Sequence, residues 1–327
     1  MTRLSRLPVL LLALLAALAL VACGGDSGGG GGGGGGGQAE EPAAGAIEEN
    51  PDNAKVTITI GSKNFTEQKL LGEIYVQGLA AAGYTVEKQL NLGDENIALR
   101  SVKEGEIDAY PEYTGTALGS FFDVAAADIP KDEQEAYEQV KEGFAEDELT
   151  ALPPTPFTSS NEVGLTAAKA KELGVKTISD LEGKDQDLTL YGSPECRQRQ
   201  DCLLGLQEVY GLDFAKFTPV ALDLRHQVLT GGQADLSIVF TTDPQIQREK
   251  FVLLEDDKGM FPPYNSTLVV RNDTVEKAGP DFETTIETVQ KGLTAEVMQE
   301  LNARVDLDKK QPAQVAEEYL TESKLIG

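Results

Sequence analysis

The sequence predicts an α/β protein built as two lobes joined by a hinge. Strand-like and helix-like segments alternate along most of the chain, as they do in α/β folds. One helix–glycine–strand unit occurs twice, at residues 102–114 and 229–241. A late strand, YNSTLVV, follows a middle section that reads as self-contained. We therefore expect the chain to cross from one lobe to the other and back.

The first 22 residues predict an export signal. Arg3 and Arg6 precede an apolar run over residues 7–22, which is shorter than the roughly 20 residues that span a bilayer and ends in small residues. The last residues of the run and Cys23 read LVAC, which resembles the lipobox of bacterial lipoproteins. We expect cleavage before Cys23 and lipid on this residue. An ordinary secretory signal followed by a chance cysteine is the alternative.

Residues 23–54 predict a flexible tether. Ten consecutive glycines, Gly28 to Gly37, lead into an acidic, proline-containing stretch that runs to about Ala54. Such a composition offers too little apolar surface to form a core, and a coil of this length spans roughly 30 Å. We expect a folded domain held close to the membrane by the lipid on Cys23.

The folded part opens with a predicted β-α-β unit. Residues 56–60 read as a buried strand, a helix is expected from Thr66 to Gly83, and residues 84–90 read as the next strand. Such a unit implies parallel strands with ligand space at their carboxyl ends. Lys63 and Asn64 lie at that end, beside a helix N-terminus that favours anions.

The internal repeat suggests that the two lobes are built alike. Both copies run from a helix end through glycine and aspartate into a strand that ends in an aromatic residue and threonine. The helix and strand alone are a common α/β connection, but the repeated aromatic–threonine ending is less easily explained that way. The matching pairs are Gly105 and Gly232, Asp108 and Asp235, Tyr113 and Phe240, and Thr114 and Thr241.

The remaining elements complete two lobes. Lobe 1 is expected to comprise residues 55–156 plus 265–327, and lobe 2 residues 157–264. Further strands are expected at about 163–166, 188–192, 235–240 and 266–270, and helices at about 131–147, 197–210, 222–230, 280–291, 294–304 and 311–322.

The charge excludes one class of partner. The formal net charge is −26, and removing the two arginines of the first 22 residues gives −26 − 2 = −28. Nucleic acid is not an expected partner, because its phosphates require a basic surface. We interpret the charge as that of a soluble extracytoplasmic surface.

Cys196 and Cys202 are predicted to form a disulfide, because a close cysteine pair outside the cytoplasm is most simply oxidised. A zinc site requires three or four ligands, so we expect no metal and no cofactor.

The single histidine argues against an enzyme. Any Ser-His-Asp or Cys-His arrangement would have to use His226, which the segment DLRHQVL places in mid-helix. The sequence contains no G-x-S-x-G, Walker A or G-x-G-x-x-G motif in its folded part.

Several motifs between residues 55 and 324 resemble one known family. They are IGSKNFTEQ, GEIDAYPEYTGTAL, GVKTISDL, VYGLDF, LEDDKGMFPPY and AEVMQELNARVD. The chain is similar to the substrate-binding proteins of osmoprotectant ABC transporters, which deliver glycine betaine, carnitine, choline or proline betaine. The resemblance implies the class II periplasmic-binding-protein clamshell, in agreement with the two predicted lobes.

The resemblance also implies a divided binding site. In this family an aromatic box holds the trimethylammonium group by cation–π contacts, and basic and hydroxyl groups hold the carboxylate. Lys63, Arg199 and Thr116 match the carboxylate-binding positions. Tyr113, Phe240 and Tyr264 match aromatics of the box.

Two departures from the family pattern bear on the ligand. Phe240 stands where the family has tyrosine, so it keeps an aromatic face without a hydroxyl. A further box tyrosine corresponds to the segment FTSSNEVGLT, where the matching place falls near Asn161 or Glu162, so the box is predicted to be incomplete.

Tyr110 is expected to pack on the face of its strand opposite Tyr113.

The resemblance implies a monomeric solute-binding lipoprotein outside the cytoplasm that passes a quaternary-ammonium zwitterion to a membrane permease. A different amino-acid-like zwitterion, or a receptor lobe without transport, are the alternatives.

Overall fold

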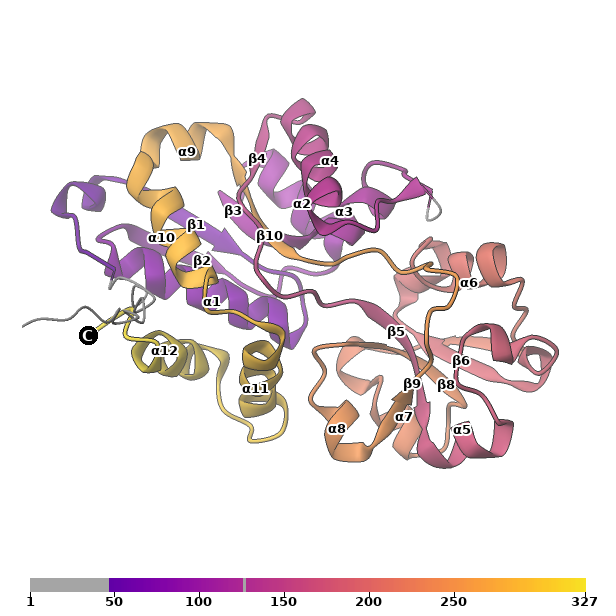
Figure 1. The fold of residues 1–327 in the computed structure, drawn as a ribbon. Coiled ribbons are helices and arrows are strands. Elements are labelled where there is room, and N and C mark those ends of the chain that lie inside the picture. The colour runs from indigo at the N-terminus through magenta and orange to yellow at the C-terminus, as the bar shows by residue number, and fades with distance from the viewer. Residues whose placement is uncertain (1–46, 126–127) are drawn as a thin grey trace, which may run out of the picture. The chain divides into compact units, whose positions relative to one another are not determined.

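The computed structural model describes residues 47–125 and 128–327 (Figure 1). The predicted export signal, Cys23 and the glycine run lie outside these residues. The described strands form two five-stranded sheets, and each sheet carries apolar clusters of buried side chains on its two faces. We call each sheet with the helices packed on it a lobe. The α/β, two-lobed prediction is confirmed.

Lobe 1 contains the sheet β2-β1-β3-β10-β4. β1 pairs in parallel with β2 and β3, whereas β10 is antiparallel to both of its neighbours. The strands are β1 (Thr57–Gly61), β2 (Thr85–Gln89), β3 (Ala109–Tyr113), β4 (Leu149–Ala151) and β10 (Ser266–Arg271). The helices are α1 (Thr66–Ala81), α2 (Glu95–Glu104), α3 (Thr114–Ser120), α4 (Glu133–Glu146), α9 (Asn272–Ala278), α10 (Pro280–Gln290), α11 (Ala295–Asp306) and α12 (Pro312–Glu322).

Lobe 2 repeats this arrangement with the sheet β7-β6-β8-β5-β9. β6 pairs in parallel with β7 and β8, and β5 is antiparallel to β8 and β9. The strands are β5 (Asn161–Thr166), β6 (Thr189–Gly192), β7 (Lys216–Pro219), β8 (Leu236–Phe240) and β9 (Phe251–Leu253). The α-helices are α5 (Ala167–Leu173), α6 (Leu203–Tyr210), α7 (Gln227–Thr230) and α8 (Gln245–Glu249), with 3-10 turns at Ser179–Leu181, Asp185–Asp187, Pro194–Gln198 (η5) and Leu222–Leu224 (η6).

The internal repeat is a repeat of structure. β3 and β8 occupy the same position in their sheets. Gly105 and Gly232 adopt φ values of 75° and 66°, a left-handed turn that glycine takes without a steric cost. The aspartates that follow, Asp108 and Asp235, accept hydrogen bonds from the backbone N–H groups of the adjacent parallel strands, at 2.7 and 2.9 Å.

The two connections between the lobes pair with each other. One runs from β4 to β5 and the other from β9 to β10 (Figure 1). Thr158 and Asn265 form an antiparallel bridge, and the Ser159 N–H donates to the Tyr264 carbonyl at 3.0 Å. The site residues Asn161 and Tyr264 therefore lie beside the predicted hinge. The predicted lobe boundaries stay predictions; the strands of each sheet fall within them.

The prediction that the tether extends to Ala54 is wrong for its last residues. From Ile47 on, the chain lies against lobe 1, where the Ile47 N–H donates to the Leu325 carbonyl at 2.9 Å. The Asn50 N–H and the Asn53 amide both donate to the Ala82 carbonyl. These polar contacts hold a segment whose composition gives no sign of burial.

Two predicted helices are also corrected. The segment 197–210 is α-helical only in α6, because residues 197–198 end the 3-10 turn η5 and residues 199–202 belong to the loop that the disulfide closes. The segment 222–230 is the 3-10 turn η6 followed by the short α7, so His226 lies between the two and not in mid-helix. Strands β4, β7 and β9 and helices α3, α5, α8 and α9 were not predicted.

Candidate ligand-binding site

Both lobes line a cavity of about 980 Å³. Its walls come from the carboxyl end of β1 and the start of α1, the end of β3, the start of β5, the loop after β6 and the end of β8. All of the predicted ligand-binding residues line it: Lys63, Tyr113, Thr116, Asn161, Arg199, Phe240 and Tyr264.

The aromatic wall contains one residue that the sequence analysis missed. The Phe65 ring lies between Tyr113 and Phe240, with ring centroids 6.2 Å and 5.6 Å away. It follows Lys63 and Asn64 directly, at the end of β1 where ligand space was expected. An aromatic side chain at that junction was the available signal. Tyr110, by contrast, is fully buried in the cluster on the other face of β3, as expected.

Lys63 is buried and already paired. Its ammonium forms an ion pair with Glu112, which is also buried. Burial raises the pKa of the Glu112 carboxyl, and the Lys63 charge counteracts this. The Lys63 ammonium also lies 4.9 Å from the centroid of the Tyr113 ring.

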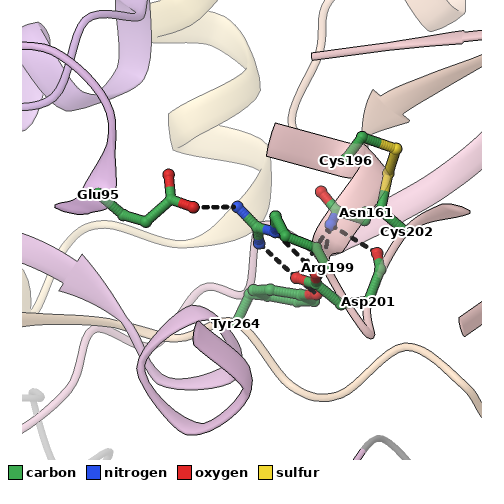
Figure 2. The surroundings of a disulfide bond; sticks show 7 residues. All are labelled: Glu95, Asn161, Cys196, Arg199, Asp201, Cys202 and Tyr264. Atoms are coloured by element: carbon green, nitrogen blue, oxygen red, sulfur yellow. Dashed lines mark hydrogen bonds and ion pairs between the residues drawn. A yellow bond between two sulfur atoms is a disulfide. The ribbon is translucent and has the colours of Figure 1, made fainter. Parts of the chain in front are cut away.

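Arg199 lies in a loop that a disulfide closes between Cys196 and Cys202, whose Cα atoms are 5.1 Å apart (Figure 2). Its guanidinium holds Asp201 with two hydrogen bonds. Burial alone would raise the pKa of Asp201, but Arg199 outweighs burial and lowers it.

The outer nitrogens of Arg199 reach lobe 1. One lies 3.4 Å from Glu95 and the other donates to Thr116 at 3.4 Å. The guanidinium thus bridges the two lobes through two long contacts. The same two nitrogens are suitable donors for a carboxylate.

Asn161, the first residue of β5, lines the cavity. Its amide nitrogen donates to the Asp201 carbonyl at 3.0 Å, to the Asp201 carboxylate at 3.2 Å and to the Tyr264 hydroxyl at 3.3 Å (Figure 2). The Tyr264 hydroxyl in turn donates to Asp201. Asn161, Asp201 and Tyr264 therefore form a hydrogen-bonded network beside the cavity.

Glu162, the other residue considered for this place, is not part of the cavity wall. Because successive side chains of a strand alternate, it points to the opposite face of β5 from Asn161. Burial, and secondarily the nearby Asp256, raises its pKa to about 8.

The Phe240 ring lies against a cationic side chain of its own lobe. The Arg225 guanidinium lies 4.4 Å from its ring centroid and is paired with Asp243. His226 also contacts Asp243, at 2.7 Å, and stacks on Phe251. Burial opposes the charge on Asp243, but Arg225 and His226 lower its pKa to about 2. The single histidine is thus held in a buried ion cluster at the cavity.

Glu67 is a second missed residue. It lies in the first turn of α1, is 3% exposed and lines the cavity. It accepts hydrogen bonds from the Tyr113 hydroxyl at 2.7 Å and from the Asn302 amide at 2.8 Å. Burial raises the pKa of its carboxyl. No sequence pattern pointed to Glu67, because an acid in a first helical turn is an ordinary partner of the helix dipole.

The fold and cavity define a class of protein. Two similar α/β lobes, joined by two paired connections and lining one cavity with aromatic and charged side chains, form a two-lobed solute-binding protein. Within residues 47–125 and 128–327, no group of three or more His, Cys, Asp or Glu side chains is placed to hold a metal ion. None of the helices in this part of the chain is long and apolar enough to cross a membrane.

Comparison with known proteins gives the family. Residues 56–322 match the substrate binding domain of ABC-type glycine betaine transport systems. The chain therefore belongs to this family, as the sequence motifs predicted.

Named relatives differ in ligand. A glycine-betaine-binding protein of Pseudomonas aeruginosa is 33% identical over 83% of this chain and 89% of its own length. An ergothioneine transport permease/ergothioneine binding protein of Helicobacter pylori is 27% identical over 84% of this chain, which spans 48% of that protein. A solved glycine betaine/carnitine/choline ABC transporter structure has a TM-score of 0.66 at 26% identity, covering 81% of this chain and 98% of its own.

Proposed function

We propose that this protein is an extracytoplasmic solute-binding protein that captures a small quaternary-ammonium zwitterion, such as glycine betaine, and delivers it to an ABC-transporter permease. The observation that carries the proposal is the meeting of all seven predicted residues in one cavity lined by both lobes. Family membership supports the small ligand and the permease partner.

The two ends of the ligand find different surroundings in this cavity. Tyr113, Phe65 and Phe240 offer aromatic faces, which attract an ammonium group. Arg199 and Thr116 face each other across the lobes and offer donors to a carboxylate. A carboxylate bound there displaces Glu95 from Arg199 and joins the lobes through the ligand. Lys63 takes part only if the ligand competes with Glu112 for its ammonium.

A lipid anchor on Cys23, an outer-face location and a monomeric state belong to the same proposal. The protein binds its ligand without converting it, in keeping with a family of binding domains.

A different amino-acid-like zwitterion is the second candidate. The observation that favours it is Asn161, which places a hydrogen-bonded amide where an aromatic face would complete the box. Such a wall fits a ligand with a polar substituent beside its ammonium group.

Isothermal titration calorimetry tests the proposal. The purified protein is titrated with glycine betaine, carnitine, choline and proline betaine, and we expect saturable heat from at least one of them. Arg199→Ala should weaken binding of the carboxylate-bearing ligands by about tenfold or more, because a hydrogen bond to a charged group is lost. Arg197→Ala, an exposed arginine in the same loop, is the matched control. Heat from none of the four ligands would refute the assigned substrate class.

A further inference from the structure

The buried acids around the cavity are paired with cations, with one exception. Each paired acid has a lysine or arginine within ion-pair distance, although Asp201 and Glu95 share the single charge of Arg199. The pairs are Glu112 with Lys63, Asp201 and Glu95 with Arg199, and Asp243 with Arg225.

The exception is Glu67. Its carboxylate accepts from the Tyr113 hydroxyl and the Asn302 amide, which are neutral donors. The hydroxyls of Thr242 and Ser159, which lie 2.8 Å from each other, face it as well. Among the described residues, Glu67 has no ion-pair partner.

A buried carboxylate without a cation is unfavourable. Removing it from water costs far more than neutral hydrogen bonds return, so such a group takes up a proton or pairs with a positive charge. Burial raises the pKa of Glu67 accordingly. The side chain lines the cavity, where a ligand can supply the missing charge.

The aromatic wall lies directly beside this carboxylate. Tyr113 bonds to Glu67 through its hydroxyl and stacks with Phe65 through its ring. Aromatic faces attract ammonium groups, and a carboxylate attracts them more strongly at low dielectric. The Lys63 ammonium near the same ring is balanced by Glu112, so it leaves the charge of Glu67 uncompensated.

We propose that Glu67 is a further ligand-binding residue, which supplies the negative charge opposite the ligand's ammonium group and makes the site select for positive charge at that end. The inference rests on the proposed function and adds a specificity-determining residue to it. A merely structural Glu67, holding Tyr113 and Asn302 in place, would instead affect charged and neutral ligands of the same shape alike.

The test compares choline with 3,3-dimethylbutan-1-ol, its neutral analogue with carbon in place of nitrogen. Affinities of both are measured by calorimetry for the wild type and for Glu67→Gln, which keeps the shape and removes the charge. We expect the wild type to prefer choline, and the choline-to-analogue affinity ratio to fall by about tenfold or more in Glu67→Gln.

Glu73→Gln is the matched control. Glu73 lies on the same helix, is also buried and pairs with Lys88, but it does not line the cavity. This variant should leave the affinity ratio unchanged.

The outcomes separate the two proposals. An unchanged ratio in Glu67→Gln, with binding retained, overturns the role of Glu67 and leaves the proposed function standing. Should Glu67→Gln not fold, equal affinity of the wild type for choline and the neutral analogue would still overturn the role of Glu67. If the wild type binds none of the four ammonium ligands titrated above, both proposals fail.

Discussion

At the scale of single residues, two neighbouring residues of β5 have different surroundings. Asn161 faces the cavity, whereas Glu162 is half-buried on the other face of the strand near Asp256. The sequence offered both residues for the same role, because it did not fix the register of β5. Pairing of Asn161 with Phe240 on β8 decides which of the two lines the cavity.

Glu162 makes the stability of the protein depend on pH. Its pKa rises from 4.5 in the ordinary state to about 8 in the fold, so between these values the folded protein holds a proton that the unfolded chain has released. This contribution to the free energy of unfolding is fully present below about pH 4.5 and is lost as pH rises through 8. We expect Glu162→Gln to flatten the pH dependence over this window, measured by urea denaturation from pH 5 to pH 8.

Glu104→Gln, at an exposed position at the end of α2, serves as the control for this experiment and should follow the wild type. Parallel curves for wild type and Glu162→Gln would show that the carboxyl is not protonated in the fold.

At the scale of elements, the loop closed by the disulfide is anchored in the core of lobe 2 and carries a proposed ligand-binding residue, Arg199. Cys196 and Cys202 are both buried in the core of lobe 2, and the loop between them carries Arg199 and Asp201 (Figure 2). The sequence indicated a bridged pair and an arginine inside it. It did not indicate that Asp201 holds the arginine, or that α6 begins only after the second cysteine.

Replacing both cysteines with serine should reduce the free energy of unfolding by about 2 kcal/mol, because the short loop regains entropy in the unfolded chain. Affinity for glycine betaine should fall several-fold as well, since Arg199 loses its fixed position. Denaturation and calorimetry of the double variant measure the two effects. Lower stability with unchanged affinity would mean that Asp201 alone positions the arginine.

At the scale of the whole described chain, helix α11 of lobe 1 contacts lobe 2 directly. It packs on α1 in lobe 1. Its Gln299 amide donates to the Thr241 carbonyl at 3.0 Å and its Asn302 amide to the Thr242 carbonyl at 3.3 Å. These carbonyls directly follow β8, which ends in Phe240. Closure of the lobes around a ligand, a hinge motion, would be favoured by such contacts.

Gln299→Ala should therefore weaken every ligand by a similar factor of a few and leave the order of preference unchanged, because the lost hydrogen bond joins the lobes without touching the cavity. Calorimetry gives the affinities, and small-angle scattering with and without ligand reports closure. Gln314→Ala, an exposed glutamine on α12, is the control. A change in ligand preference would place Gln299 in the binding site instead.

Much of the fold could be predicted because it depends on local patterns. The apolar face of α1, the Gly105 and Gly232 turns and the alternation of strands and helices are read directly from neighbouring residues. The strands β4 and β9 were not predicted, because three residues are too few to show the alternation that identifies a strand. The sequence predicts the Cys196–Cys202 disulfide, but the apolar pattern before Tyr210 does not show that α6 begins only at Leu203.

By itself the sequence determined the two-lobed α/β class and the repeat, since these follow from residue types in order along the chain, and its resemblance to the family pointed to the seven residues that line one cavity. Only the tertiary structure decided which charges are already balanced. Glu112, Asp201 and Asp243 meet their cations, and Glu67 does not, through contacts among residues that are mostly far apart in the sequence. Charge compensation in a buried site depends on distances of a few ångströms, and those are set when the sheets and helices pack.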